Sequence, residues 1–217
     1  MSIKNNIKKI KQELPANIIL VAATKTRSVD EINQAIESKI NIIGENYIQE
    51  AKKKYSKLKE KVKFHCIGHL QKNKVKKAVE IFDMIQTVDS TKIAEEIDKR
   101  CKSINKTMPI LIEINSGKEP NKDGVMPEDT INLIKEISQL KNIKIKGLMT
   151  MAPYFEDAKK DRPYFKLTKT LFNKIKTLNI PNVDMEILSM GMSHSYKIAI
   201  EEGANMIRIG SKLFGSR

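Results

Sequence analysis

Cysteine, tryptophan and long apolar runs are scarce or absent in this chain of 217 residues. Its two cysteines, Cys66 and Cys101, are far apart, which argues against a disulfide framework and predicts a reducing, cytoplasmic location. No run reaches the ~18 apolar residues of a membrane-spanning helix. The apolar stretch 18–23 follows a proline and an asparagine and ends at a threonine and a lysine, so we interpret it as a buried strand rather than a signal peptide.

Aromatic residues make up only 5% of the chain, although its net charge is +14. A nucleic-acid-binding protein concentrates positive charge on one face, beside aromatic side chains that stack on bases. Here the lysines are spread over every predicted helix. We therefore interpret the lysines as solvated surface residues and expect no specific nucleic-acid partner. The net positive charge still predicts weak nonspecific binding of polyanions.

Short apolar runs alternate with amphipathic segments from one end of the chain to the other. Continuous apolar runs are typical of strands buried on both faces. The segments between them carry helix signals, such as the capping box of Ser28 and Glu31. This alternation indicates a parallel sheet. The predicted strands are 18–23, 40–43, 64–67, 84–88, 109–114, 144–149, 185–188 and 205–209.

Eight strand–helix units predict an α/β fold, a single (β/α)8 TIM barrel over residues 1–217 with an extra N-terminal helix at 3–14. An open, doubly wound sheet is the alternative, because strand counts from one sequence are fallible. The barrel is short at 217 residues, since about 250 is typical. We expect one domain, with nothing left for a second.

Lys25 comes directly after the first predicted strand. Barrels of this kind carry their sites at the carboxyl ends of the strands, so its side chain is expected at the barrel mouth. Desolvation disfavours the ammonium form of a lysine, and a neutral amine attacks aldehydes. An ordinary surface lysine at the start of a loop is the alternative, and position alone would favour it.

Two neighbouring loops have the chemistry of a phosphate site. Barrels often bind phosphate after strands seven and eight, through backbone N–H groups. After the seventh predicted strand, Gly191 allows close backbone approach, and Ser193 offers a hydroxyl and a helix cap. Gly210 and Ser211 repeat the arrangement after the eighth. Tight capped turns are the alternative, but two such loops at the expected strands favour a phosphate site.

Arg208 lies inside the last predicted strand, between Ile207 and Ile209. Its guanidinium keeps its charge, so the side chain needs a polar or anionic partner. The barrel lumen, with a ring nitrogen or an anion as partner, is one possibility. A salt bridge to Glu113 or Glu186 is the other, and the sequence leaves both open.

His65, Cys66 and His69 come nearest to a metal-binding pattern. However, His65 and Cys66 are consecutive in a strand and point to opposite faces, and no second pair supports them. We therefore expect no metal site. The glycine fingerprints of dinucleotide-binding and Walker loops are absent from the sequence.

Seven stretches, taken together, carry a resemblance to a known family. They are AATKT at 22–26, IGENYIQE at 43–50, HCIGHLQKNK at 65–74, KGLMTM at 146–151, LSMGMS at 188–193, IRIGS at 207–211 and FG at 214–215. The chain resembles the pyridoxal phosphate homeostasis proteins, which are similar to the N-terminal barrel domain of alanine racemase. The stretches run in family order through nearly the whole chain, and their combination is highly specific.

The resemblance implies that pyridoxal 5′-phosphate (PLP) forms a Schiff base with Lys25, that Asn46 lies beside the cofactor and that Arg208 faces the pyridine nitrogen. It also implies a set of phosphate-binding residues, namely Ser189, Ser193, Gly210 and Ser211. One departure is the pair His194 and Ser195, where the family usually has an acidic residue.

A cationic partner discourages protonation of the pyridine nitrogen, which makes PLP a poorer electron sink. In alanine racemase a neighbouring subunit and a second domain complete the site, and we expect that domain to be missing here. The leading hypothesis is a monomeric regulatory protein that sequesters, buffers or delivers PLP, with effects on amino-acid and keto-acid pools and apo PLP enzymes as candidate recipients. A weak amino-acid racemase is the second. A different phosphate-binding barrel or a basic nucleic-acid protein, with Lys25 incidental, is the third.

Overall fold

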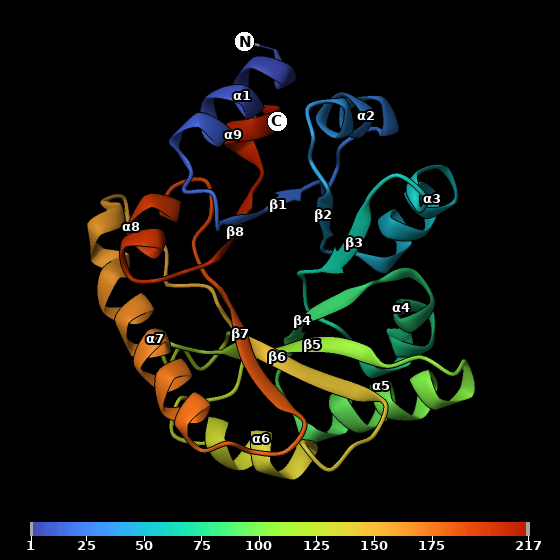
Figure 1. Ribbon diagram of the computed structural model, residues 1–217, viewed down its shortest axis with the longest axis vertical. Helices are drawn as coiled ribbons and strands as arrows, with labels where there is room; N and C mark the ends of the chain where they lie inside the picture. The colour runs from blue at the N-terminus through green and yellow to red at the C-terminus, as the bar shows by residue number, and fades with distance from the viewer. Residues whose placement is uncertain (1, 216–217) are drawn as a thin grey trace.

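Eight parallel strands close into a barrel in the computed structural model, which describes residues 2–215 (Figure 1). Each strand pairs with the next in sequence, and β8 pairs with β1 to complete the circle. This closure excludes the open sheet and confirms the predicted (β/α)8 architecture. The strands are β1 (Ile19–Ala23), β2 (Ile42–Glu45), β3 (Lys63–Cys66), β4 (Met84–Val88), β5 (Met108–Ile114), β6 (Ile143–Thr150), β7 (Val183–Ser189) and β8 (Met206–Ile209).

Helices surround the barrel on its outside (Figure 1). They are α1 (Ile3–Glu13), α2 (Val29–Glu37), α3 (Ile48–Leu58), α4 (Val75–Ile81), α5 (Thr91–Ser103), α6 (Thr130–Ile137), α7 (Arg162–Thr177), α8 (Tyr196–Glu201) and α9 (Ser211–Phe214), with the short 3₁₀ helices η1 (Lys72–Lys74) and η2 (Ala158–Asp161). The extra helix α1 lies beside α9, where the Asn6 amide donates to the Leu213 carbonyl at 3.1 Å. None of the described helices is both long and apolar enough to span a membrane.

The strand β2 begins and ends two residues later than predicted. The prediction followed the apolar run, but Ile40 still belongs to the turn after α2, where its N–H donates to the Ala35 carbonyl at 3.1 Å. Gly44 instead continues the ladder and pairs with Ala23 of β1. A Cβ at Gly44 would lie 2.6 Å from Cδ1 of Ile67, so a side chain at this strand position would have to displace that of Ile67.

The apolar core has two parts that lie on opposite faces of the strands. The larger part packs the outer face of the barrel against the helices and includes Ile85, Ile112 and Leu148. A small cluster of Met84, Leu111 and Met149 is separate from it. Because successive side chains on a strand point to opposite faces, this small cluster fills the barrel lumen.

A bulge in β6 determines the position of the end of that strand. The register slips between Ile145 and Gly147 on both sides of β6. Gly147 has a φ of +146°, and a Cβ there would lie 1.8 Å from the carbonyl oxygen of Ile187. A bulge of this kind adds one residue to one strand of a pair and re-aims the side chains that follow it. Glycine is therefore required at position 147.

Substitution of this glycine tests the bulge. We expect Gly147→Ala to lower the free energy of unfolding by about 3 kcal/mol or more, because it combines backbone strain with a clash against neighbouring backbone. Urea denaturation followed by circular dichroism measures the change. Gln34→Ala, on the exposed face of α2, is the control and should change the stability by less than about 0.5 kcal/mol. Equal stability of the two variants would contradict the bulge.

Candidate functional site

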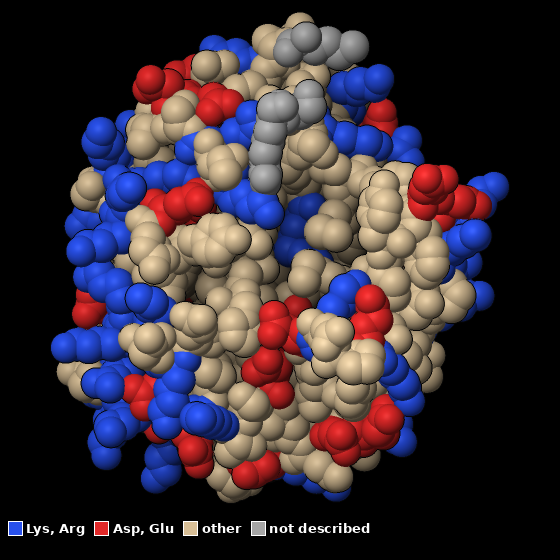
Figure 2. Space-filling model, turned by 180° about the vertical axis from the view of Figure 1, so that it is seen from behind, with Lys and Arg blue, Asp and Glu red and all other residues tan. Residues whose placement is uncertain are grey.

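A pocket of about 420 Å³ opens at the barrel mouth, among the segments that follow β1, β2, β3, β6, β7 and β8. Figure 2 shows one face of the molecule with a hollow near its centre, mostly tan and with blue side chains in its depth. All but one of the cofactor residues expected from the sequence line the pocket, namely Lys25, Asn46, Ser193, Arg208, Gly210 and Ser211. Segments from opposite ends of the chain therefore share one pocket.

The turn that carries Lys25 is held from below by a buried ion pair. Nζ of Lys54, on α3, lies 2.7 Å from Oε1 of Glu45 and donates to the carbonyl of Thr24 at 2.8 Å. The Thr24 hydroxyl donates to the same carboxylate oxygen at 2.5 Å. Burial raises the pKa of Glu45, and the contacts with Lys54 and Thr24 oppose that shift. The residue before Lys25 is thus fixed by both partners.

The residue after Lys25 is fixed as well. Thr26 has a φ of +67°, which is unusual for a residue with a branched side chain. Its N–H donates to Oε2 of Glu50 at 2.7 Å, and Nζ of Lys54 lies 3.6 Å from the same oxygen. Lys54 therefore links the carboxylates that hold both sides of the Lys25 turn. The sequence carried no signal for Lys54, because α3 brings it to the turn only in the folded chain.

Asn46 follows β2 and is positioned by the neighbouring loop. Gly68 packs against it so closely that a Cβ there would lie 2.5 Å from the Asn46 carbonyl oxygen and 2.7 Å from its Cα. Any side chain at position 68 would push Asn46 out of its place at the pocket wall. Gly68, which follows β3, thus determines the position of Asn46, which follows β2.

The two glycine loops expected to bind phosphate are joined by a hydroxyl. Oγ of Ser193 accepts from the N–H of Gly210 at 3.2 Å and from the N–H of Lys212 at 3.4 Å. The expected role of Ser193 as the cap of α8 is wrong, because that helix begins later and the hydroxyl is used between the loops. Gly191 has a φ of +84°, and a Cβ there would lie 2.6 Å from Cβ of Ala199.

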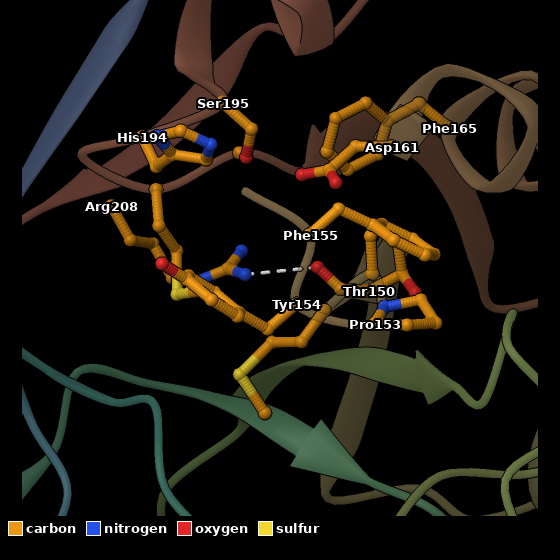
Figure 3. A pocket seen from close by; sticks show the side chains of 13 residues that line it. Thr150, Pro153, Tyr154, Phe155, Asp161, Phe165, His194, Ser195 and Arg208 are labelled. Carbon is orange, nitrogen blue, oxygen red and sulfur yellow. Dashed lines mark hydrogen bonds between the residues drawn. The ribbon is translucent and has the colours of Figure 1, made fainter. Parts of the chain in front are cut away.

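Arg208 points into the lumen and is almost fully buried. Its Nη1 donates to the carbonyl and the hydroxyl of Ser189 at 3.0 and 2.7 Å, and its Nη2 donates to the carbonyl of Thr150 at 2.9 Å (Figure 3). Among the described residues, neither Glu113 nor Glu186 forms an ion pair with it. Burial lowers the pKa of Arg208 to about 10, so the guanidinium stays charged at neutral pH.

Ser189 occupies a different place from the one expected. It is completely buried and does not line the pocket. Its hydroxyl donates to Oε1 of Gln86 at 2.7 Å while accepting from Arg208. Nε2 of Gln86 lies 3.0 Å from Nδ1 of His65, whose pKa burial lowers to about 3. Ser189 thus belongs to a hydrogen-bonded layer in the lumen that holds Arg208 from beneath.

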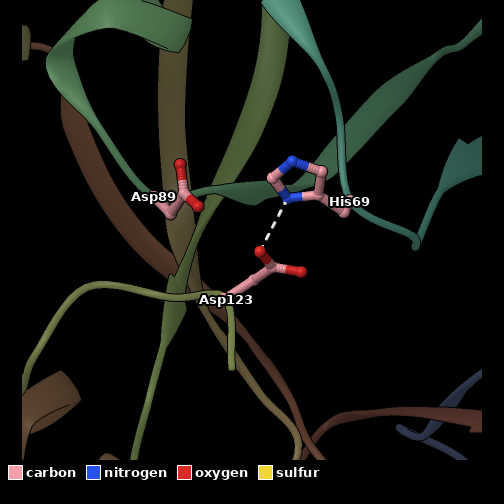
Figure 4. A group of neighbouring side chains, drawn as sticks. All are labelled: His69, Asp89 and Asp123. Atoms are coloured by element: carbon pink, nitrogen blue, oxygen red, sulfur yellow. Dashed lines mark ion pairs between the residues drawn. The ribbon is translucent and has the colours of Figure 1, made fainter. Parts of the chain in front are cut away.

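The three residues of the metal-like sequence pattern lie in three different surroundings. His65 belongs to the lumen layer, and Cys66 belongs to the outer apolar core. His69 is half exposed, and its Nδ1 lies 2.9 Å from Oδ1 of Asp123, with Asp89 beside them (Figure 4). The sequence did not predict this last grouping, which depends on the loops after β3, β4 and β5 meeting at the rim.

The pocket is also lined by residues outside the expected cofactor set, among them Arg27, Met151, Tyr154, Met192 and His194. The sequence feature that could have indicated a role for Arg27 was its position two residues after Lys25. Its guanidinium donates to the Gly215 carbonyl at 2.6 Å and lies 5.5 Å from the ring centroid of Phe214. These contacts tie the C-terminal end of the described chain to the Lys25 turn.

An acidic group does lie beside His194 and Ser195, although the sequence has none within that turn. Asp161, at the end of η2, is turned toward both residues (Figure 3). Burial raises its pKa, while a hydrogen bond with Ser195 and attraction to His194 oppose the shift. The turn therefore has no acidic residue of its own, but a carboxylate from η2 lies beside it.

Comparisons with known proteins agree with this geometry. The family described as "Alanine racemase, N-terminal domain" matches residues 1–217. The "Pyridoxal phosphate homeostasis protein" of Aquifex aeolicus is 41% identical over 199 residues, which cover 91% of this chain and 86% of that protein. The chain belongs to the pyridoxal phosphate homeostasis protein family.

Solved structures place this homeostasis-family protein among similar barrels. PipY of Synechococcus elongatus, solved without PLP, is 32% identical, has a TM-score of 0.93 and is matched over 99% of this chain and 100% of its own. The same protein has also been solved with PLP bound, at a TM-score of 0.91. An alanine racemase of Clostridium difficile is 18% identical with a TM-score of 0.81, and the match covers 56% of that chain, so it shows the shared fold alone.

Removal of the buried lysine tests the support beneath Lys25. We expect Lys54→Met to lower the free energy of unfolding by about 3–5 kcal/mol, because Glu45 would be left as an unpaired buried charge. Urea denaturation measures the change. Lys53→Met, on the exposed face of α3, is the matched control. The double variant Glu45→Met with Lys54→Met should recover much of the loss, and a single variant as stable as the control would contradict the buried pair.

A second test concerns Glu113, on β5, and asks whether its carboxyl is buried in the folded protein. Burial raises the pKa of Glu113 to about 7, and attraction to Arg208 opposes the shift. A raised folded-state pKa stabilises the fold below the unfolded pKa, and this stabilisation is lost as pH rises through 7. We therefore expect Glu113→Gln to gain stability relative to the unsubstituted protein between pH 4.5 and 8, by up to roughly 3 kcal/mol. Urea midpoints at both pH values, with Glu95→Gln on α5 as control, measure this. A difference that does not grow with pH would contradict it.

Proposed function

We propose that this protein binds PLP as a Schiff base on Nζ of Lys25 and acts in PLP homeostasis by sequestering, buffering or delivering the cofactor. The observation that carries the proposal is the convergence of Lys25, Asn46, Arg208 and the two glycine loops on one pocket. The names of the relatives, and the PLP bound by PipY, support the same cofactor.

The residues around the pocket fit the chemical groups of PLP. The pocket volume of about 420 Å³ lies within the ~300–1,000 Å³ typical of small-molecule sites. At Gly210 a Cβ would lie 3.3 Å from the carbonyl oxygen of Ala23, so the glycine lets this loop lie close to the end of β1, next to the Lys25 turn. The Ser193 and Ser211 hydroxyls line the same end. When bound, PLP would supply an aldehyde that reacts reversibly with amines.

Arg208 supports a carrier in preference to a catalyst. Its guanidinium is held by Ser189 and Thr150 and stays charged, so a pyridine nitrogen facing it would remain unprotonated. An unprotonated ring withdraws electrons poorly and favours carbanion chemistry less. Reversible attachment to Lys25 is then the main chemistry of the site. Effects on amino-acid and keto-acid pools would follow through the PLP enzymes that receive or lose the cofactor.

We place this activity in the cytoplasm, in one barrel domain over residues 1–217 that works as a monomer. Cys66 and Cys101 are both free thiols buried in the core, which suits a reducing compartment. Candidate recipients are PLP enzymes that lack their cofactor, and neither nucleic acid nor a membrane is needed for this role.

Reduction of the loaded protein with borohydride tests the attachment site. We expect peptide mass mapping to find the pyridoxyl group on Lys25, and Lys25→Ala to lose the visible absorption band of the Schiff base. Lys72→Ala, at the exposed start of η1, is the control and should keep both signals. A pyridoxyl group on another lysine, or a full band in Lys25→Ala, would sink the proposal.

The same loaded preparation separates the carrier from the enzyme. We expect an apo PLP enzyme to regain activity when mixed with the loaded protein, while alanine enantiomers interconvert no faster than with free PLP. Efficient racemisation that is lost in Lys25→Ala would contradict the carrier role and establish the racemase in its place.

A further inference from the structure

A second, smaller cavity adjoins the PLP pocket between the loop after β6 and the start of α7 (Figure 3). Its volume is about 50 Å³. The two spaces share five lining residues, namely Met151, Tyr154, Met192, His194 and Arg208. The two spaces are therefore neighbours with these side chains as their common wall.

The far wall of this cavity holds a carboxylate that is not fully paired. Asp161 is only 5% exposed, and its Oδ1 has no hydrogen-bond partner among the described residues. It stands where α7 begins, yet its side chain makes no capping bond to that helix. Figure 3 shows the carboxylate turned into the cavity. A buried carboxylate oxygen without a partner is costly, and a cation or hydrogen-bond donor would satisfy it.

Aromatic rings form the walls beside this carboxylate. Phe155, Phe165 and Tyr154 line the cavity, and Phe155 is stacked on Tyr164 with ring centroids 5.8 Å apart. Aromatic faces attract cations, and a carboxylate accepts charge-assisted hydrogen bonds from an ammonium group. Arg208 also lines the cavity, but its guanidinium is engaged by the carbonyl of Thr150. The Asp161 end is therefore the one suited to a cation.

The size of the cavity limits what it can hold. A cavity needs about 10–15 Å³ to hold a single water, so about 50 Å³ accommodates a few non-hydrogen atoms. This is the size of the last few atoms of an aliphatic amine.

We propose that this cavity binds the protonated amino group of a small aliphatic amine, with Asp161 as its acceptor and the aromatic rings around its carbon chain. The cavity adjoins the pocket where Lys25 would hold PLP, and amines are the compounds that react with that cofactor. The substrate class is thus compounds with two amino groups, one for PLP and one for Asp161. Only the assignment of this substrate class rests on the proposed function, because it requires PLP on Lys25. The binding of one amino group by Asp161 does not.

A titration of the PLP-free protein tests the cavity by itself. Propylammonium chloride is added to ¹⁵N-labelled protein, with 1-propanol as the neutral probe and sodium chloride to match ionic strength. We expect propylammonium to shift the amide signals of Phe155, Asp161, Phe165 and Ser195 and to bind at least tenfold more tightly than propanol. Equal binding of the two probes, or shifts elsewhere on the protein, would overturn the proposal. This arm uses only the unsubstituted protein, so its outcome does not depend on whether a variant folds.

Substitution of the carboxylate provides the second arm. Asp161→Asn should weaken propylammonium binding about tenfold or more, since a charged hydrogen bond is worth about 1.5–3 kcal/mol. Glu156→Gln, in the exposed part of the same loop, is the matched control and should leave binding unchanged. Unaltered affinity in a folded Asp161→Asn protein would overturn the assignment of Asp161.

The substrate class is tested with PLP-loaded protein, in which the nitrogen of an added amine would form a new C=N bond to the cofactor while the bond to Nζ of Lys25 breaks and the lysine leaves as a free amine. Borohydride reduction and peptide mass mapping then measure how much pyridoxyl group remains on Lys25. We expect 1,4-diaminobutane to displace PLP from Lys25 at concentrations at least tenfold lower than butylamine, and Asp161→Asn to remove this difference. Equal displacement by both amines would overturn the substrate class. Propylammonium binding without any PLP binding would defeat the proposed function alone, and PLP binding without propylammonium binding would defeat the cavity proposal alone.

Discussion

The pairing of β8 with β1 is the constraint on which the site depends. Val21 pairs with Arg208, and Ala22 pairs with Ile209. Because the strands are parallel, the turn after β1 and the loop after β8 emerge at the same rim. Gly210 then approaches the Ala23 carbonyl so closely that a Cβ would lie 3.3 Å from it. Lys25 and the second glycine loop, far apart in the sequence, become neighbours only through this closure.

The same closure forces a buried charge into the lumen. A guanidinium in the middle of β8 cannot remain unpaired inside a barrel, since burying an unpaired charge costs a great deal. The hydrogen-bonded layer of His65, Gln86 and Ser189 meets this demand beneath the pocket. Below it, the lumen is filled by the apolar cluster that includes Met84 and Leu111. This polar layer thus lies between the apolar cluster and the open mouth of the barrel.

Charged groups outside the lumen support the site in a second way. The Glu45–Lys54 pair lies between β2 and α3 and holds the Thr24 side of the Lys25 turn. Asp161 places a carboxylate beside His194 and Ser195 from η2, although this chain has no acidic residue within that turn. In both cases a helical segment outside the barrel supplies a charge to a loop at its mouth. The chemistry of the mouth therefore depends on the outer layer as well as on the strands.

The sequence by itself determined the barrel and the rim residues. Continuous apolar runs, and polar residues directly after them, are local features, so the order of residues alone was enough to place Lys25 and Asn46 after strands and Arg208 within the last one. The end of β2 could not be predicted in the same way, because Gly44 joins the ladder through backbone hydrogen bonds that its side chain does not reveal.

Only the tertiary structure decided which residues act on one another. Ser189 was expected at the phosphate, but the direction of the Arg208 side chain makes it a partner of that guanidinium. Lys54 and Asp161 carried no sequence signal, since α3 and η2 bring them to the mouth by packing against the barrel. Strand order follows from local patterns, whereas the partner of a buried charge depends on segments that meet only when the barrel has closed.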